Sequence, residues 1–442
     1  MNTALDPAVP ASAVNRPVEG RATARWKQIA VALALVAGAI YFIARGPVRA
    51  VQGGSVDFRY YFYVAQRTFA QGGNPYRMHD LLATAAGVSE GHRQFLQAVD
   101  NPVIIYPPSF FVIAPMGLLP VKLAVWLWIL AQCIAFAALL RWASQFAATA
   151  WTPCQRGLFV ACGLCLAPVH TGIAGGSTGP LFTSLAVALF LSLQKNSTGW
   201  AGLILGLLMI KPTFGIPAAV VASILARWRV LALGFAVWWL TSLPMFWRFG
   251  IRESLSGFLN SVLLQAAPGG PANETLQNPA HYSLLNLRAW WHSILGPVYA
   301  EVSTVVVLML MLYALLRFRR QSHAAGSAPY WTLAGCFICL ATYHRSYDAA
   351  IVAVPLAAAF DLYRLGGPYF WTWVTALVPF AVPGGTFLHL KLGVLSHRFP
   401  LLELLLVRHQ TVALIILATL AVVGLRRLSG LARVSETVKL EV

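Results

Sequence analysis

The chain has 442 residues, of which 58% are hydrophobic and 10% are charged, whereas a soluble protein of this size carries roughly a quarter charged residues. Its formal net charge is +18, but the basic residues form short groups (RWK, RWR, RFRR, RR) between apolar runs. That arrangement follows the positive-inside rule of membrane proteins and not the basic stripe of a nucleic-acid-binding protein. The composition therefore argues against a soluble enzyme and against nucleic acid as a partner, and it predicts an all-α polytopic membrane protein.

Apolar runs close to the roughly 20 residues that cross a bilayer recur from end to end. They predict about 12 transmembrane helices. The expected spans are 28–44, 109–120, 121–141, 157–173, 180–194, 200–226, 229–247, 299–316, 330–343, 347–364, 369–387 and 410–427. The run 109–120 is short, and Lys211-Pro212 interrupts 200–226.

The domain organisation follows from these spans. Residues 1–25 are polar and predict a disordered cytoplasmic tail, 26–427 form one transmembrane domain, and 428–442 form a second cytoplasmic tail. The segments 45–108 and 248–298 are expected on the extracytoplasmic side of a cell inner membrane, where they carry short interfacial helices. Both are too long for simple connectors, so we expect function there.

Six cysteines include two CxxC pairs, Cys162/Cys165 and Cys336/Cys339. Both pairs lie in apolar helices without a histidine or acid at ligand spacing, so packing as small hydrophobic side chains is favoured over metal binding. No acidic cluster suited to a divalent ion is evident. We therefore expect no metal and no cofactor.

The stretch "GGSVDFRYYFYVAQRTFAQGGNPY" (53–76) predicts a helix that begins at Val56 or Asp57 and ends at Gly72. One face carries Phe58, Phe62, Ala65 and Phe69 and is expected to lie in the outer membrane interface; the other carries Asp57, Tyr60, Val64 and Arg67 and is expected to face a cavity. Asp57 stands in the first turn, where the helix dipole favours its ionised form. It is a candidate general base or cation partner; the alternative is a helix-terminal charge with no further role.

The stretch "NPVIIYPPSFFVIAPMGLLP" (101–120) contains two adjacent prolines. Irregular backbone at membrane depth is tolerated where it lines a cavity. Tyr106 is therefore a candidate ligand contact, although a plain interfacial start of a helix explains the prolines equally well.

Lys211 is the one charged residue between 196 and 226. An ammonium inside a span costs several kcal/mol, so we expect it to face a cavity, an acid or a bound phosphate. Snorkelling to the interface is the alternative.

The stretch "ATYHRSYDAAIVAVP" (341–355) places His344 and Asp348 four residues apart, on one helical face, with Arg345 between them. Asp348 is expected to pair with Arg345 or to orient the imidazole. A purely structural ion pair is the alternative. The glycine-rich turn "AGGSTGPLF" (174–182) lacks a nucleotide fingerprint, and packing is its expected role.

These stretches share an order that resembles glycosyltransferase family 87 of the GT-C superfamily. The resemblance rests on an early Asp57 followed by "GGNPY", then "YPP", a P-x-x-L-P close, the G-x-x-x-x-x-K-P helix (206–212) and "YHRSYD". The turn "GGSTGPL" departs from the family's GQ-x-N-x-L because it lacks the Gln and the Asn. The resemblance implies an inverting transferase with a GT-C-type fold. Its donor would be a polyprenyl-phosphate-linked sugar, such as mannose, used on the non-cytoplasmic face.

Carried over to this sequence, the resemblance makes Asp57 the general base and His344 a donor-phosphate or acceptor contact. An inverting transfer needs one carboxylate for the acceptor proton and cations for the departing phosphate. The expected phosphate-binding residues are Lys211, His344, Arg345 and Arg59. The expected cavity-lining residues are Tyr60, Tyr61, Asn74, Tyr106 and Asp348. The expected partners are membrane lipids, the lipid-linked donor and a lipid or glycan acceptor.

Two other functions remain compatible with the sequence. One is a transporter or flippase of lipid-linked sugars, in which the buried charges would gate or couple transport. The other is an outer-face oligosaccharide polymerase or ligase. The transferase hypothesis requires Asp57, Lys211 and His344 to converge on one site, since one transfer reaction brings base and phosphate together.

Overall fold

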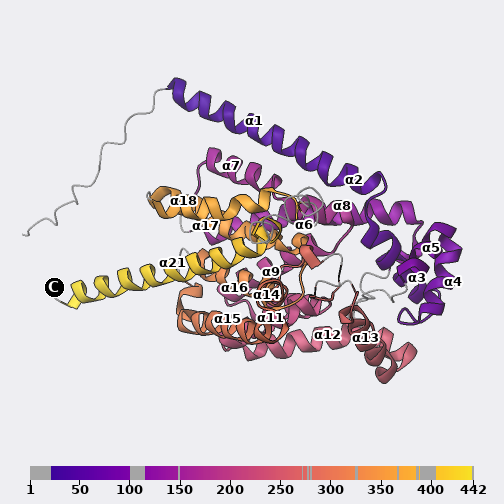
Figure 1. Cartoon of the computed structure of the whole chain (residues 1–442). Helices are drawn as coiled ribbons and strands as arrows, with labels where there is room; N and C mark the ends of the chain where they lie inside the picture. The colour runs from indigo at the N-terminus through magenta and orange to yellow at the C-terminus, as the bar shows by residue number, and fades with distance from the viewer. Residues whose placement is uncertain are drawn as a thin grey trace, which may run out of the picture.

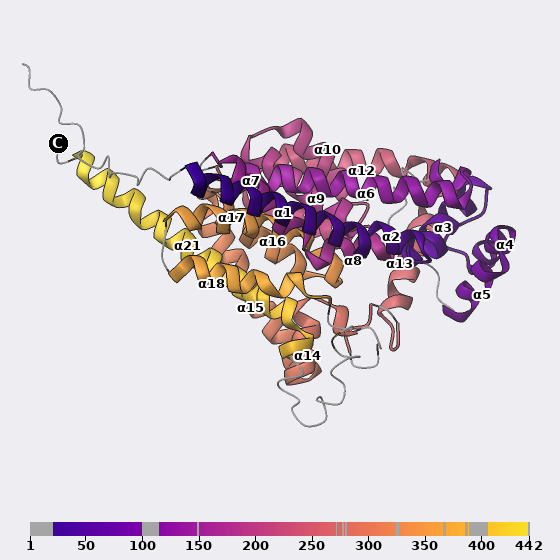
Figure 2. The ribbon, with the colours of Figure 1, turned by 90° about the horizontal axis from the view of Figure 1, so that it is seen from above.

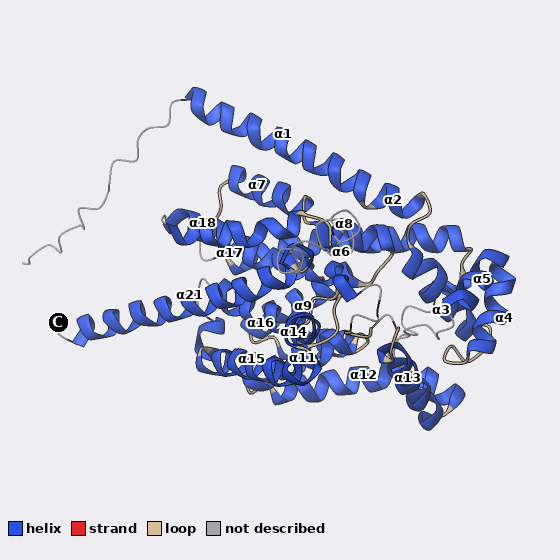
Figure 3. Cartoon of the chain, viewed as in Figure 1, coloured by secondary structure: helices blue, strands red, loops and turns tan. Residues whose placement is uncertain are grey.

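The computed structural model describes residues 21–99, 115–147, 150–270, 272–275, 278, 281–323, 327–365, 368–384, 388 and 405–440. In this part of the chain every regular element is a helix, as Figure 3 shows, and the one β-type contact is an isolated bridge between Leu284 and Arg345. The predicted all-α class is confirmed.

The described elements follow one another along the chain in three groups. The first group is α1 (Arg21–Arg45), α2 (Pro47–Val51), the π-helical η1 (Asp57–Phe62), α3 (Tyr63–Ala70), α4 (Met78–Val88), α5 (Glu90–Val99) and α6 (Val121–Ala143). The second is η3 (Ser144–Phe146), α7 (Pro153–Leu164), α8 (Ala167–Gly175), α9 (Gly179–Gln194), α10 (Thr198–Leu208), α11 (Pro212–Ile224) and α12 (Trp228–Phe249). The third is α13 (Ile251–Ala266), η4 (His281–Ser283), α14 (Leu287–Leu295), α15 (Pro297–Arg317), η5 (Arg319–His323), α16 (Ala328–Ala341), η6 (Ser346–Val352), α17 (Ala353–Leu365), α18 (Pro368–Leu377), η7 (Val378–Ala381) and α21 (His409–Leu440).

Five helices of the described chain are long and apolar enough to cross a membrane. They are Arg25–Val51, Val121–Phe146, Trp228–Phe249, Pro297–Arg317 and His409–Arg427. The pair α7 and α8, bent by 48°, makes up to six. Five further apolar helices have 10–17 residues, among them α9 and α16. The expected count of about 12 spans is therefore not confirmed, and part of the expected span 109–120 lies outside the described residues.

Two expected spans are broken, and prolines mark both breaks. The run 200–226 is divided into α10 and α11 at Lys211, whose backbone is extended (φ −112°, ψ 92°), with Pro212 opening the new helix. The run 157–173 bends between α7 and α8, and Pro168 stands in the first turn of α8. Proline has no N–H and a fixed φ, so it begins a helix well and continues one badly.

The most deeply buried helices lie at the centre of the bundle. Every residue of α16 from Ala328 to Leu340 except Pro329 is buried, and it contacts α15, α17 and α21. Cys336 and Cys339 are buried in it as free thiols. By contrast, α1 runs along the outside of the bundle, against α7 (Figures 1 and 2).

The two segments expected to be outer loops meet at one end of the molecule, where Figure 1 shows α3–α5 and α13. The Arg77 guanidinium lies 2.6 Å from a carboxylate oxygen of Glu253, at the start of α13. In addition, Arg248 donates to the carbonyl of Phe69 at 2.8 Å. Segments about 180 residues apart thus form a common wall beside the Asp57 helix.

The predicted helix after the first span exists, but its faces differ from the prediction. Its first turn is π-helical, which shifts every later side chain relative to an α-helix. The Phe58 and Phe62 side chains are buried in the protein, with Phe58 stacked on Trp128 at 4.9 Å between ring centroids. Val64, expected toward a cavity, is fully buried as well. The placement of the apolar face in the membrane interface was therefore wrong: the core covers it.

Candidate functional site

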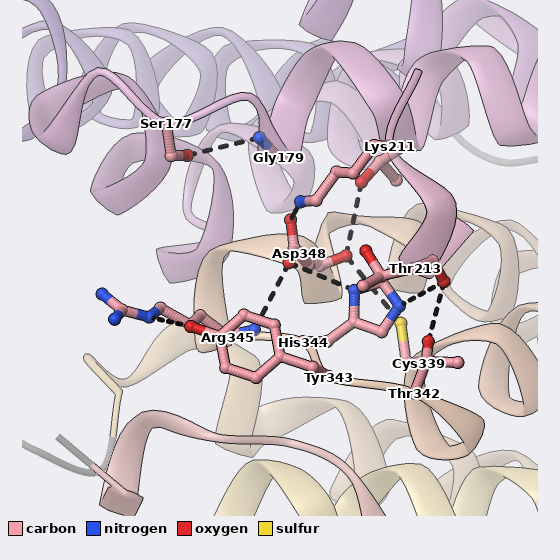
Figure 4. A network of polar contacts seen from close by, with 11 residues as sticks. Ser177, Gly179, Lys211, Thr213, Cys339, Thr342, Tyr343, His344, Arg345 and Asp348 are labelled. Atoms are coloured by element: carbon pink, nitrogen blue, oxygen red, sulfur yellow. Dashed lines mark hydrogen bonds and ion pairs between the residues drawn. The ribbon is translucent and has the colours of Figure 1, made fainter. Parts of the chain in front are cut away.

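A buried group of charges forms where α10 ends and η6 begins. The Lys211 ammonium lies 2.6 Å from Oδ1 of Asp348, and Nδ1 of His344 lies 3.1 Å from Oδ2 of the same carboxylate (Figure 4). Side-chain exposure is 7% for Lys211, 2% for Asp348 and 0% for His344. We call these three residues the charge cluster. The alternative of a snorkelling Lys211 is excluded, because its ammonium points to an acid inside the protein.

Local chain geometry brings the three side chains together. Lys211 is the residue before α11 and has extended backbone, so it interrupts the helix between α10 and α11. Asp348 stands in the first turn of η6, where its carboxylate accepts the backbone N–H of Arg345 at 3.3 Å. Asp348 therefore pairs with Lys211 and orients His344, while its contact with Arg345 is through the backbone.

The imidazole of His344 is fixed on both sides. Its Nε2 lies 3.0 Å from the carbonyl oxygen of Thr213, in the first turn of α11. The same carbonyl accepts the Thr342 hydroxyl at 2.7 Å, and the ring meets the Phe214 ring edge-on at 4.6 Å. The charge cluster thus joins α11 to the chain after α16.

The glycine-rich turn between α8 and α9 packs between Asp57's helix and the charge cluster. A Cβ at Gly176 would lie 2.7 Å from Cα of Ser55, and one at Gly179 would lie 3.1 Å from Oδ1 of Asp348. Gly176 also has φ +72°, a left-handed conformation that favours glycine. The Ser55 N–H donates to the carbonyl of Ala174 at 2.6 Å. These contacts agree with the expected packing role. They place the turn between the Asp57 helix and Asp348.

Asp57 lies within the electric field of this cluster. Burial raises the pKa of its carboxyl, the positive charges of Arg345 and Lys211 lower it, and Asp348 raises it. Burial raises the pKa of Tyr61 to about 12, and the charge of Asp57 contributes to that rise. The structure therefore brings Asp57, Tyr61 and Arg345 into one neighbourhood with the charge cluster.

Two predicted residues make their contacts elsewhere. Arg59 donates to the carbonyl oxygens of Ala50 and Val51, at 3.4 and 3.2 Å, at the carboxyl end of α2. Tyr60 stacks on Phe95 of α5, with ring centroids 4.5 Å apart. These contacts hold the Asp57 helix against its neighbours, so neither residue joins the charge cluster.

Asn74 is buried, and its side chain makes hydrogen bonds that stabilise the turn after α3. Its Nδ2 donates to Glu253 at 2.9 Å, and its Oδ1 accepts the N–H of Tyr76 at 3.0 Å. It therefore supports the wall between α4 and α13. Tyr106, the remaining predicted residue, lies outside the described residues.

Sequence reasoning missed the two tyrosines that flank Arg345. The Arg345 Nε donates to the Tyr343 hydroxyl at 2.7 Å (Figure 4). The Tyr347 ring lies 6.0 Å from the Lys211 ammonium, against Gly179. The available signal in the sequence was the spacing Y-x-R-x-Y, which places a tyrosine two residues to either side of Arg345. Within the described residues, no three His, Cys, Asp or Glu side chains gather in a way that could hold a metal ion.

The comparisons with known proteins give one match. The profile of glycosyltransferase family 87 matches residues 105–330, just over half of the chain, while no curated protein and no solved structure matches. The matched range contains the glycine-rich turn and Lys211, whereas Asp57 and the segment 344–348 lie on either side of it. Together with apolar helices that can span a membrane, this match shows that the chain belongs to glycosyltransferase family 87 and is a membrane glycosyltransferase.

Proposed function

We propose that this transferase moves a sugar, mannose or a related one, from a polyprenyl-phosphate donor to a lipid or glycan acceptor. Transfer occurs with inversion on the non-cytoplasmic face of the cell inner membrane, with Asp57 as general base. The contacts that join the Asp57 helix to the charge cluster through the glycine-rich turn support the proposal: the Ser55 N–H donates to the carbonyl of Ala174, and Gly179 packs against Asp348. In this setting burial raises the pKa of Asp57, while the charges of Arg345 and Lys211 lower it.

The two acids near the site have different surroundings, and that difference supports different roles. Both carboxylate oxygens of Asp348 are engaged, one by Lys211 and the other by His344. Asp57 lies beside these charges, and burial makes it a stronger base than a free aspartate. Since acid and base roles follow from environments that push pKa values apart, Asp57 accepts the acceptor's proton and Asp348 holds the cations in place.

The two cations near Asp57, Lys211 and Arg345, also have different roles. Lys211 already pairs with Asp348, so it acts on the phosphate through its field. Arg345 carries a planar fork that can bind two phosphate oxygens, and the Tyr343 hydroxyl orients that fork through Nε. We therefore assign Arg345 the direct phosphate contact, where it stabilises the charge that develops on the leaving group.

The sidedness rests on the basic ends of the helices. Arg227, before α12, contacts His323 of η5 at 3.1 Å, so the groups RWR and RFRR lie together. A positive-inside orientation places this end in the cytoplasm. The 25 residues of α1, from its basic N-terminus toward Asp57, rise roughly 37 Å at about 1.5 Å each, enough to cross the bilayer. Asp57 then lies on the opposite face.

The test is a transfer assay with purified protein in nanodiscs, a radiolabelled polyprenyl-phosphate sugar and a membrane-lipid extract. Wild type, Asp57→Asn and the control Glu90→Gln, an acid at the exposed start of α5, are compared. We expect product from wild type and Glu90→Gln, and a loss of roughly 10²- to 10⁴-fold in Asp57→Asn, the usual contribution of a general base.

Two outcomes would contradict the proposal. Equal transfer by Asp57→Asn would remove Asp57 as the base. No transfer by wild type, together with labelled lipid crossing the bilayer of reconstituted vesicles, would identify a flippase instead.

A further inference from the structure

His344 has oxygen acceptors at both ring nitrogens. Nδ1 faces the carboxylate of Asp348 at 3.1 Å, and Nε2 faces the backbone carbonyl of Thr213 at 3.0 Å, with the side chain fully buried. A neutral imidazole has one N–H donor, so one of its nitrogens would direct a lone pair at an oxygen lone pair. An imidazolium donates from both. We infer that His344 is held as an imidazolium, which adds a positive charge at the site proposed for the donor phosphate.

The surrounding groups leave no other source for the second hydrogen bond. The Thr213 carbonyl can donate nothing, and its two lone pairs serve His344 and the Thr342 hydroxyl. The Asp348 carboxylate is ionised, because Lys211 pairs with it at 2.6 Å. Turning the ring over would place carbon atoms at both acceptors and lose both hydrogen bonds.

Within the described residues, the cations of the site are Lys211, Arg345 and the His344 imidazolium, and its acids are Asp348 and Asp57. The other described titratable groups near Asp348 and Arg345 are the Cys339 thiol and the Tyr61, Tyr343 and Tyr347 hydroxyls. An imidazolium gives these residues one more positive charge than a neutral His344 would.

This additional charge suits the reaction, and here the inference rests on the proposed function. A polyprenyl-phosphate sugar is a phosphodiester with one negative charge, which the imidazolium attracts. During transfer the acceptor oxygen bonds to the anomeric carbon, the bond from that carbon to the phosphate oxygen breaks, and its electron pair stays on the phosphate. The acceptor proton moves to Asp57, while the phosphate becomes a monoester with about −1.5 to −2 charges at pH 7. The imidazolium therefore opposes the negative charge that develops on the phosphate.

The first experiment reads the protonation state without any reaction. Wild-type protein labelled with ¹⁵N-histidine in nanodiscs is studied by NMR at pH 7 without donor. The pair Tyr-His occurs once in the sequence, at 343–344, so residue-pair labelling assigns His344 without a variant. We expect both ring nitrogens to show protonated shifts. One unprotonated nitrogen would overturn the inference while leaving the transferase proposal intact.

The second experiment measures the charge match with farnesyl phosphate as probe and farnesol as its uncharged counterpart. We expect His344→Gln to bind farnesyl phosphate about tenfold more weakly than wild type at pH 7, because one nearby charge is lost. Both proteins should bind farnesol equally. His79→Gln is the matched control, since His79 also contacts an aspartate, Asp80 at 3.3 Å, but is 94% exposed.

The outcomes separate the two proposals. Equal binding of farnesyl phosphate by wild type and His344→Gln would overturn the role of the charge, and the NMR measurement on wild type tests the inference even if His344→Gln fails to fold. Loss of farnesol binding in parallel would do the same, since farnesol has no charge. An imidazolium at His344 together with no sugar transfer by wild type would refute the proposed function and leave this inference standing.

Discussion

Two ionic contacts of this protein have the same length and different surroundings. Lys211 and Asp348 meet at 2.6 Å with 7% and 2% of their side chains exposed, and Arg77 and Glu253 meet at 2.6 Å with 64% and 41% exposed. Water screens the second pair, so its contribution to stability is small. The first pair is removed from water and held by protein groups, so losing one partner leaves a buried charge. The two ion pairs therefore differ in burial and not in distance, and only the buried pair belongs to the candidate site.

The two contacts also connect different parts of the fold. Arg77–Glu253 joins the α3–α4 turn to α13, where the Asn74 side chain also donates to Glu253, and Arg248 of α12 donates to the carbonyl of Phe69 nearby. Lys211–Asp348 joins a broken span to a segment 137 residues away. We therefore expect substitutions in the first contact to be tolerated and those in the second to be severe.

The largest effect is expected for Asp348→Asn. The amide leaves Lys211 and His344 without a counter-charge, which costs about 3–5 kcal/mol of stability for a broken buried pair. Thermal unfolding in detergent measures it. The double variant Lys211→Met/Asp348→Asn should recover part of the loss, because the buried ammonium is gone. A single variant as stable as wild type would refute the comparison.

A comparable effect on activity is expected from pH, through Asp57. Burial raises the folded pKa of Asp57 above 3.8, so its carboxylate becomes protonated as pH drops through that raised pKa. The proposed general-base role therefore predicts that kcat/KM falls over the same pH range. The free energy of unfolding should rise as pH falls over this range. The reason is that the raised pKa disfavours the charged form in the folded state, so protonation stabilises the protein. Asp57→Asn should abolish both pH effects. An acid limb at or below the pKa of a free aspartate would contradict the assignment.

An intermediate effect is expected for Gly179→Ala. The new Cβ would meet the Tyr347 carbonyl at 2.8 Å and Asp348 Oδ1 at 3.1 Å, so overpacking costs about 1–3 kcal/mol. Gly175→Ala, at the end of α8, is the control, because no atom lies within 4 Å of its Cβ. Equal unfolding temperatures for the two variants would show that the turn does not press on the charge cluster.

A smaller effect is expected for Tyr343→Phe, which removes the hydroxyl that orients Arg345. One net hydrogen bond is worth about 0.5–1.5 kcal/mol, so kcat/KM for the donor should fall up to roughly tenfold. In the background Arg345→Lys the same change should have no further effect, since the oriented fork is already absent. Additive losses would show that Tyr343 acts independently of Arg345.

The smallest effect is expected for Glu253→Gln. An exposed pair contributes about 0.2–1 kcal/mol, and the amide can still accept from Arg77. Unfolding at low and high salt measures it, and raised salt should remove most of the difference from wild type. A loss as large as that of Asp348→Asn would mean that exposure does not separate the two contacts.

The sequence alone determined the membrane-protein class, the all-α fold, the family, the start of a helix at Asp57 and the break at Lys211. Each depends on properties that act within one or two helical turns, such as apolar length, proline geometry and the order of short motifs. The tertiary structure decided which residues meet. It paired Lys211 with Asp348, turned the apolar face of the Asp57 helix into the core, and used Arg59 and Asn74 to hold helices together. A charge at a chain break is visible in the sequence, but its partner 137 residues away follows only from how the helices pack.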